Sequence, residues 1–166
     1  MSKSLDLSSF ELIFEHSPIP LWEIDYTEMF SYFDTLKEDG VKDLKKYLIE
    51  NPTEFLLFID KSKITQINQK VLDLYEIDSK KEFELNSSRF FTKKSREIFI
   101  QQLDHFFKGD THFSANTEII TKNNTLKHIR LKSNLIKKDE KVLAIVSTED
   151  ICKEKIQEQQ FKDAVV

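Results

Sequence analysis

Residues 111–147 decide the fold, because three strand-like runs follow one another there with little chain between them. The runs are THFSANTEIIT at Thr111–Thr121, LKHIRLKSNLI at Leu126–Ile136 and KVLAIVS at Lys141–Ser147. Two polar turn sequences, Lys-Asn-Asn-Thr and Lys-Lys-Asp-Glu, separate the runs. Strands joined by short loops pair with each other in a sheet. The sequence therefore predicts an antiparallel meander.

A helix is predicted immediately before the meander. Between about Lys93 and Lys108, apolar Phe99, Leu103 and Phe106 recur at helical spacing. Gly109 follows as a C-terminal stop, because glycine readily takes the left-handed conformation that ends many helices.

Two shorter helices and a strand are predicted further upstream. One helix is capped by Asn68 and runs through Tyr75, and the other begins at Asp78 or Ser79. Residues 64–68 form a short strand before them. At the N-terminus, the pattern predicts a helix over Ser8–His16 that ends before Pro18, and a first strand over Ile19–Asp25.

The segment at 26–62 is expected to be helical. Met29, Phe33 and Leu36 are spaced as one helical face, and a second face follows the break at Gly40. Asn51-Pro52 predicts the start of a third helix, with Asn51 as its cap. Residues 55–59 fit either that helix or a strand, and the pattern leaves both open.

The composition excludes several classes of protein. The 166 residues suit one domain with a short appendage, and the net charge of -4 lacks the basic excess that nucleic-acid binding requires. The single cysteine cannot form an intramolecular disulfide, which fits a reducing cytoplasm. Two glycines cannot build a phosphate-binding loop, and no leader or membrane-spanning stretch is expected.

The predicted order of elements is that of a PAS domain, and local sequences strengthen the resemblance. FEHSPI at 14–19 resembles the opening segment of many PAS domains. Ile67-Asn68, followed by Leu72 and Tyr75, resembles their second strand and the helix after it. Asp150-Ile151, followed by charged residues, resembles the junction at which a PAS domain passes into its output helix.

The resemblance implies an α+β fold, with a five-stranded antiparallel sheet, helices on one face and flanking helices at both termini. Its expected parts are an N-terminal flanking helix at 1–16, a PAS-like sensor domain at 17–150 and the start of an output or linker helix at 151–166. The chain departs from the family pattern at 26–62, where PAS domains have a tight turn and a helical insertion is expected here.

The resemblance also implies a function. Such a domain would be a cytoplasmic input module of a bacterial sensor histidine kinase or diguanylate cyclase. It would bind a small-molecule ligand or a partner and relay a conformational signal to a C-terminal output module that these residues do not contain. A homodimer is expected through the terminal helices. Two alternatives stay open: a constitutive dimerisation adaptor with a filled core, and a small-molecule enzyme.

The resemblance places the candidate ligand site between the sheet and the helices, where the residues that form the core would also line the pocket. Six residues are candidates for this site: Trp22, Glu23, Phe99, Phe106, Ile129 and Leu131. Glu23 is included because a carboxylate within an apolar strand could meet a hydrogen-bonding ligand. The candidate relay residues are Glu149, Asp150 and Ile151, which lead into the outgoing helix.

The cysteine and the histidines give no indication of a metal, haem or redox site. Haem-binding PAS sensors take a histidine from the long helix, but His105 lies about 100° from its apolar stripe and is expected at the surface. Cys152 follows the last strand and is expected to be structural. The remaining histidines, His16, His112 and His128, have no partners at metal-ligand spacing. We therefore expect no catalytic residue, no metal site and no bound cofactor.

Overall fold

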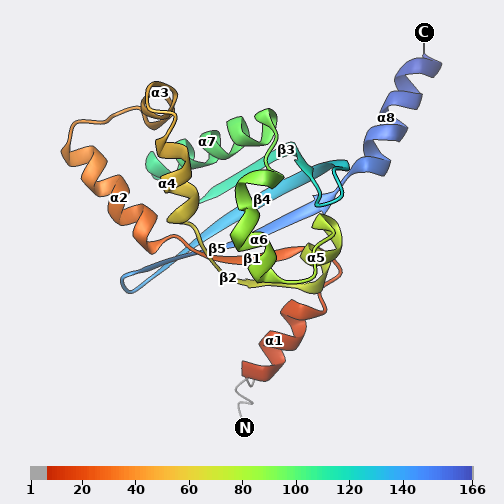
Figure 1. The fold of residues 1–166 in the computed structure, drawn as a ribbon, viewed down its shortest axis with the longest axis horizontal. Coiled ribbons are helices and arrows are strands. Elements are labelled where there is room, and N and C mark those ends of the chain that lie inside the picture. The colour runs from red at the N-terminus through yellow and green to blue at the C-terminus, as the bar shows by residue number, and fades with distance from the viewer. Residues whose placement is uncertain (1–6, 166) are drawn as a thin grey trace.

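The structure, a computed structural model, describes residues 7–165 and is built on a five-stranded antiparallel sheet (Figure 1). The strands lie in the order β2-β1-β5-β4-β3. Their bounds are β1 Leu21–Asp25, β2 Lys63–Ile67, β3 His112–Ile120, β4 Leu126–Lys138 and β5 Lys141–Asp150. The last three strands form the predicted meander, and the predicted α+β fold class is confirmed.

Helices cover one face of this sheet, and one helix flanks it at each end of the described chain (Figure 1). Their bounds are α1 Leu7–Glu15, α2 Thr27–Glu38, α3 Leu44–Glu50, α4 Glu54–Asp60, α5 Gln69–Tyr75, α6 Lys80–Asn86, the 3-10 turn η1 Ser87–Phe90, α7 Lys93–Phe107 and α8 Cys152–Ala164. The long helix α7 ends as predicted, since Gly109 has a φ of 102° and donates its N–H to the Phe106 carbonyl.

The two faces of the sheet differ because side chains alternate along each strand. Trp22 pairs with Val146 in the register of β1 and β5, and both side chains are buried under the helices. The next pair, Glu23 and Ile145, points to the opposite face, where Ile145 is exposed. The core therefore lies on the helix side of the sheet.

Three helices, α2, α3 and α4, occupy the segment between β1 and β2, where the insertion was expected. Phe33 of α2 packs against Phe58 of α4 and, edge to face, against Phe107 at the end of α7. The insertion thus shares one core with the rest of the domain. Residues 55–59, for which helix and strand were both open, lie in α4.

Two of the predicted helix caps are confirmed. The side chains of Asn68 and Ser79 accept N–H groups of Val71 and Glu82, as expected of N-caps. The predicted cap at Asn51 is wrong. Its side chain donates to the Tyr47 carbonyl and so serves the end of α3, while α4 begins only at Glu54.

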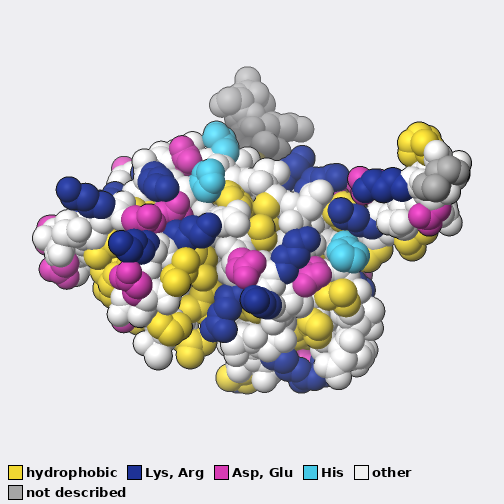
Figure 2. All heavy atoms as spheres, turned by 90° about the horizontal axis from the view of Figure 1, so that it is seen from above, with side chains coloured by type: hydrophobic (Ala, Val, Ile, Leu, Met, Phe, Trp, Pro, Cys, Tyr) yellow, Lys and Arg dark blue, Asp and Glu magenta, His cyan; other side chains and the backbone are white. Residues whose placement is uncertain are grey.

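Side chains of both charge signs are interspersed on the face shown in Figure 2, and α8 projects from the body at the right of that view. No buried residue lies on α8 within the described chain. Among residues 7–165, no helix is long and apolar enough to cross a membrane.

Candidate functional site

A cavity of about 510 Å³ lies between the inner face of the sheet and the helices. Trp22, Ile24, Ile129, Leu131 and Val146 form its floor on β1, β4 and β5. The helix side contributes five aromatic residues, Tyr75, Phe83, Phe90, Phe91 and Phe99, together with Ile98 and other aliphatic and polar residues. The volume and the apolar walls are typical of sites for small organic molecules.

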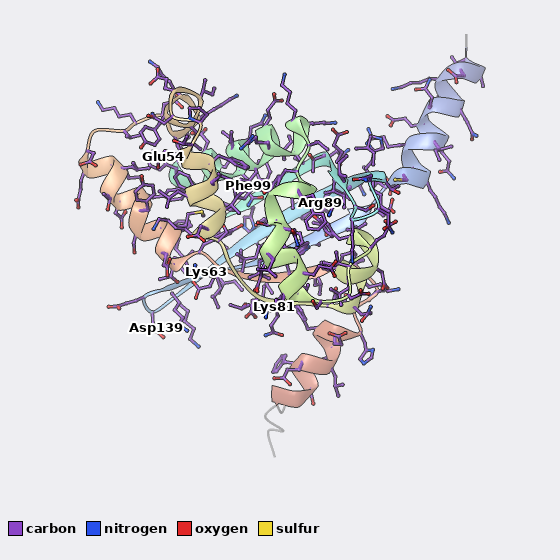
Figure 3. All side chains as sticks on the ribbon, in the orientation of Figure 1. Glu54, Lys63, Lys81, Arg89, Phe99 and Asp139 are labelled. Carbon is purple, nitrogen blue, oxygen red and sulfur yellow. The ribbon has the colours of Figure 1, made fainter. Side chains whose placement is uncertain are left out.

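Four of the six predicted ligand-site residues line this cavity: Trp22, Phe99, Ile129 and Leu131. The Trp22 indole is held in place by a hydrogen bond from Nε1 to Thr148 Oγ1 of 3.0 Å. Its ring meets Tyr75 and Phe83 edge to face, with centroids 5.4 and 4.9 Å away. Phe99, labelled in Figure 3, packs against Phe55 and Phe91 of the helix layer.

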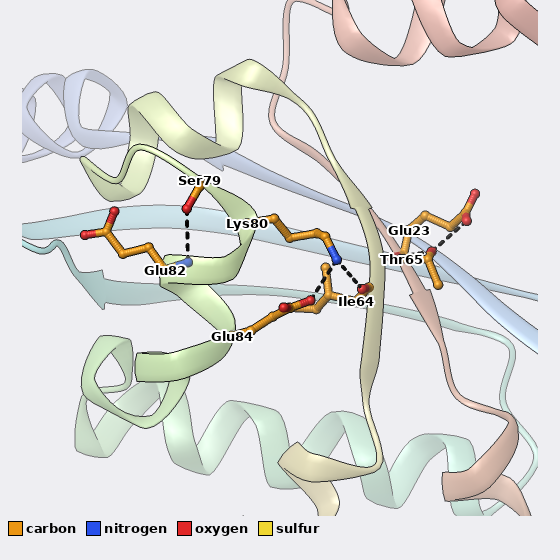
Figure 4. A network of polar contacts seen from close by, with 7 residues as sticks. All are labelled: Glu23, Ile64, Thr65, Ser79, Lys80, Glu82 and Glu84. Carbon is orange, nitrogen blue, oxygen red and sulfur yellow. Dashed lines mark hydrogen bonds and ion pairs between the residues drawn. The ribbon is translucent and has the colours of Figure 1, made fainter.

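The other two predicted residues do not line the cavity. Glu23 points to the opposite face of the sheet, and its carboxylate accepts a hydrogen bond from Thr65 Oγ1 of 2.6 Å (Figure 4). The alternation along β1 that buries Trp22 turns Glu23 outward. Phe106 is buried, but it lies nearly two turns beyond Phe99 on α7 and packs against the Tyr26 ring.

Several polar residues that the sequence interpretation missed line the cavity, and Gln102 and Thr117 are the most deeply buried of them. Gln102 of α7 is 2% exposed, and its Nε2 donates to the Tyr26 hydroxyl at 3.2 Å. Thr117 of β3 is 4% exposed, and its Oγ1 has no hydrogen-bond partner among the described residues. Their positions carried a signal, because Gln102 is three residues after Phe99 on the apolar face of α7 and Thr117 alternates inward with Phe113 and Ile119.

The interior of the cavity is uncharged. Burial raises the pKa of the Tyr26 and Tyr75 hydroxyls well above the usual tyrosine value, so both stay neutral. The charged residues of the lining, Asp60, Lys63 and Glu84, are all exposed. The interior of the cavity is therefore mostly apolar, with a few uncharged polar groups, and the charged residues lie at its rim.

One lysine bridges the two sides of the rim (Figure 4). Lys80 Nζ reaches from α6 to the Ile64 carbonyl of β2 at 3.3 Å and also pairs with Glu84 Oε1 at 2.8 Å. Ile64 and Glu84 both line the cavity. Lys80 thus joins the helix wall to the edge strand at the rim.

Strand β4 connects the cavity with α8. Ile129 and Leu131 face the cavity, and Arg130 between them points to the other side of the sheet. Arg130 donates to Glu154 Oε2 of α8 at 2.7 Å and lies 3.9 Å from Glu149 Oε2. The sequence interpretation missed Arg130, although its place between two inward apolar residues indicates an outward charge.

The three predicted relay residues lie where β5 becomes α8. Ile151 is buried, and its N–H donates to the His128 carbonyl of β4 at 2.9 Å. The Asp150 carboxylate accepts the N–H of Cys152 at 2.9 Å, and Glu149 faces Arg130. These contacts hold the first turn of α8 against β4.

Comparison with solved structures identifies the architecture. The chain is similar to a light-oxygen-voltage domain studied with a flavin analogue (TM-score 0.56, 9% identity, 96% of each chain covered). It is also similar to the PAS domain of the fruit-fly ELK potassium channel (TM-score 0.53, 11% identity, 87% of this chain and 96% of that one). A third match is a PAS domain from a two-component sensor histidine kinase (TM-score 0.52, 5% identity, 87% and 95% covered). The chain has the PAS fold.

At the level of sequence, no protein-family model and no curated protein matches the chain.

The helical insertion of this PAS fold also contributes to the site. Leu56 and Ile59 of α4 line the cavity beside its rim, where Leu56 is exposed. The segment between β1 and β2 therefore forms part of the cavity wall.

The residues weighed for metal or haem chemistry lie away from the cavity. His105 is exposed, as predicted, and its Nδ1 lies 2.8 Å from Asp110 Oδ2. Cys152 accepts the His128 N–H at 3.3 Å, and burial raises the pKa of its thiol. No group of three or more potential metal ligands occurs in the part of the chain that the structure describes.

Proposed function

We propose that this PAS fold is a sensory input domain that binds a small molecule between its sheet and its helices. The observation that carries the proposal is the cavity of about 510 Å³ with its aromatic walls. A domain that served only as a rigid scaffold would gain stability by filling this space, because close packing is the rule in protein interiors. The cavity therefore favours the sensor over the adaptor.

The proposed signal route runs through β4 into α8. A ligand that touches Ile129 and Leu131 acts on the same strand whose Arg130 binds Glu154. In this proposal the domain exchanges between two conformations that differ in how α8 is held against β4. A ligand shifts the equilibrium between them only as far as it binds one conformation better than the other. We assign Glu149, Asp150 and Ile151 to this route, because their contacts fix the beginning of α8.

The proposal includes partners that these residues do not contain. An output module, a histidine kinase or a diguanylate cyclase of a bacterial signalling protein, would follow α8. A homodimer would form through the terminal helices, since α1 and α8 expose Phe10, Ile13, Ile156 and Phe161. The single cysteine fits a cytoplasmic location.

The enzyme alternative has weaker support. Catalysis by side chains requires titratable groups that converge on a reacting atom. The charged residues of the cavity lining stand on its exposed rim, and the buried tyrosines are held neutral. We propose that the domain regulates a reaction carried out elsewhere.

A thermal screen of metabolites on the full chain tests the proposal. A ligand at a hundredfold excess over its Kd stabilises the native state by about 2.7 kcal/mol, which is a shift in melting temperature of roughly 5–10 °C for a chain of this size. Leu131→Phe places a larger side chain in the cavity, which reduces the space for a ligand, and should abolish the shift. Lys132→Phe adds the same ring on the outward side of β4 and should leave it intact.

The adaptor would take the place of the sensor if the broad screen gave no shift in the wild-type chain. A compound whose shift survived Leu131→Phe and a further change at Phe99 would bind elsewhere, and the cavity would lose its assigned role.

A further inference from the structure

We propose that the cavity takes an uncharged, largely apolar ligand with one carboxamide-like group, whose donor and acceptor are bound by Thr117 and Gln102. This inference rests on the proposed function, because it names the chemistry of the molecule that the cavity would bind.

Thr117 carries a buried hydroxyl that is free to bind a ligand group. Its Oγ1 is buried and has no hydrogen-bond partner within residues 7–165, although the side chain lines the cavity. A buried hydroxyl without a partner is costly and therefore uncommon in native proteins. A ligand group that donates a hydrogen bond to this oxygen, or accepts one from its O–H, would remove that cost.

Gln102 supplies the second half. The bond from Nε2 to the Tyr26 hydroxyl is the one hydrogen bond of this amide in the described chain. An amide has two donor hydrogens and an acceptor oxygen, so the group retains capacity for both kinds of bond. A carboxamide matches this capacity, because it also presents a donor and an acceptor side by side.

The surroundings of these two residues exclude a charged group at this position. Tyr26 and Tyr75 are buried and neutral, and the lining residues that carry charge lie at the exposed rim. An ionised group placed beside Thr117 would lose its water without gaining a counter-charge, which is far more costly than burying a neutral amide. The remaining walls are aromatic and favour a flat apolar body.

Three probes of nearly the same shape test the inference on the full chain: 2-naphthamide, 2-naphthoate and naphthalene. Trp22 is the only tryptophan and stands on the cavity wall, so its single indole N–H signal in a ¹H–¹⁵N spectrum reports binding. We expect 2-naphthamide to bind at least tenfold more tightly than 2-naphthoate. Thr117→Val should raise the Kd of 2-naphthamide about three- to tenfold, the usual range for one buried hydrogen bond, and leave that of naphthalene unchanged.

Ser133→Ala is the matched control. Ser133 also has a buried hydroxyl with no partner in the described chain, but it is not part of the cavity lining. Both substitutions remove an unsatisfied hydroxyl, so both variants should melt at or above the wild-type temperature. Ser133→Ala should leave all three affinities unchanged.

The possible failures point to different conclusions. If 2-naphthamide binds Thr117→Val as tightly as the wild type, or if 2-naphthoate binds as tightly as 2-naphthamide, the inference is wrong while the cavity remains a binding site. If none of the three probes moves the Trp22 signal at its solubility limit, the cavity does not admit molecules of this kind and the inference is wrong, whereas the proposed function falls only if the metabolite screen also gives no shift.

Discussion

The Glu82 carboxylate joins α6 to the residue before the helix cap and to the turn after β3. It accepts the Asp78 N–H at 3.0 Å and forms an ion pair with Lys122 in the turn after β3. The helix that it steadies carries Phe83 and Glu84 of the cavity wall. The hydrogen bond from Asp78 and the pairing with Lys122 lower the pKa of this carboxyl below its usual value of 4.5.

This shift predicts a pH-dependent effect of Glu82→Gln. A carboxyl with a lowered pKa in the folded state stabilises the protein above its unfolded pKa, and this contribution is lost as the pH falls through the folded value. The variant should therefore melt at a lower temperature than the wild type at pH 7, and the gap should close as the pH falls below 4.5 and through the lowered pKa of Glu82. Thermal melts across this range measure the effect.

Glu140→Gln is the control for the pH series, because Glu140 is an exposed carboxylate at the β4–β5 turn without a hydrogen bond or ion pair among the described residues. It should melt like the wild type at pH 7. A constant gap between Glu82→Gln and the wild type from pH 7 to pH 3 would show that the ionised carboxylate is not the stabilising group.

The residues of the site were only partly predictable from sequence. Apolar spacing places Trp22 and Phe99 in the core, because large aromatic side chains are buried in almost any fold. It does not show where the core is hollow, so Phe106 looked equivalent to Phe99 although it packs against Tyr26. Gln102 went unnoticed because a search for apolar stripes passes over a polar residue on the buried face.

At the scale of elements, helix α6 and strand β2 meet at the rim through the Lys80 side chain, which donates to the Ile64 carbonyl. Because Lys80 itself does not line the cavity, we expect its bridge to affect passage across the rim and not the bound state. Lys80→Met should therefore increase both the association and the dissociation rate of 2-naphthamide severalfold, with a Kd within about twofold of the wild type. Exposed ion pairs contribute little to stability, so the variant should unfold almost like the wild type.

Lys81→Met is the matched control for this prediction (Figure 3). Lys81 is the next residue on α6, is exposed, and makes no side-chain hydrogen bond or ion pair within the described residues. Relaxation-dispersion measurements on the Trp22 indole N–H would give the rates. Equal rates in Lys80→Met and Lys81→Met would show that the bridge does not control access.

Elements were more predictable than residues because local chemistry decides them. Asn68 and Ser79 accept the N–H groups that a helix start leaves free, and this signal lies within four residues. Residues 55–59 were ambiguous because a short dense apolar run fits a buried strand as well as a buried helix. The packing that accompanies the helical form comes from residues distant in sequence. Phe33 of α2 contacts both Phe58 of α4 and Phe107 of α7.

At the scale of the whole molecule, we propose that Arg130 couples the cavity to α8 through its ion pair with Glu154, and Cys152 can report that coupling. Cys152 is the only cysteine and lies half-buried at the start of α8. Arg130→Met removes the contact with Glu154 and should raise the rate at which a disulfide reagent labels Cys152 at pH 8. Saturating 2-naphthamide should change the labelling rate in the wild type at least twofold and leave the rate in Arg130→Met unchanged.

Lys155→Met controls for the loss of a charge near α8, because Lys155 pairs with Glu158 within the helix at 3.8 Å. It should keep the response of the wild type to the probe. A labelling rate that responds to 2-naphthamide equally in Arg130→Met and in the wild type would mean that the signal takes another route to α8.

We expect the exposed apolar side chains of the terminal helices to determine the assembly of the molecule. Ile156 and Phe161 of α8 are 57% and 72% exposed, and α1 also exposes apolar side chains. Burying apolar area at about 25 cal/mol per Å² favours association of these helices in a second copy of the chain. We therefore predict a parallel homodimer that forms through α1 and α8. In sedimentation equilibrium, the full chain should show a mass above that of the monomer, and a chain of residues 17–150 should remain monomeric.

Two further variants distinguish this specific interface from non-specific association through exposed apolar residues. The double substitution Ile156→Glu and Phe161→Glu should return the full chain to monomer, because it places like charges where two apolar strips would meet. Leu85→Glu, at an equally exposed position on α6 (73%), should leave the dimer intact. In a Cys152→Ser background, Val165→Cys should form a disulfide between copies, because a parallel arrangement brings the two C-terminal ends together. Equal monomer masses for the full and the shortened chain at high concentration would refute the dimer, and a dimer that resists this disulfide would refute its parallel geometry.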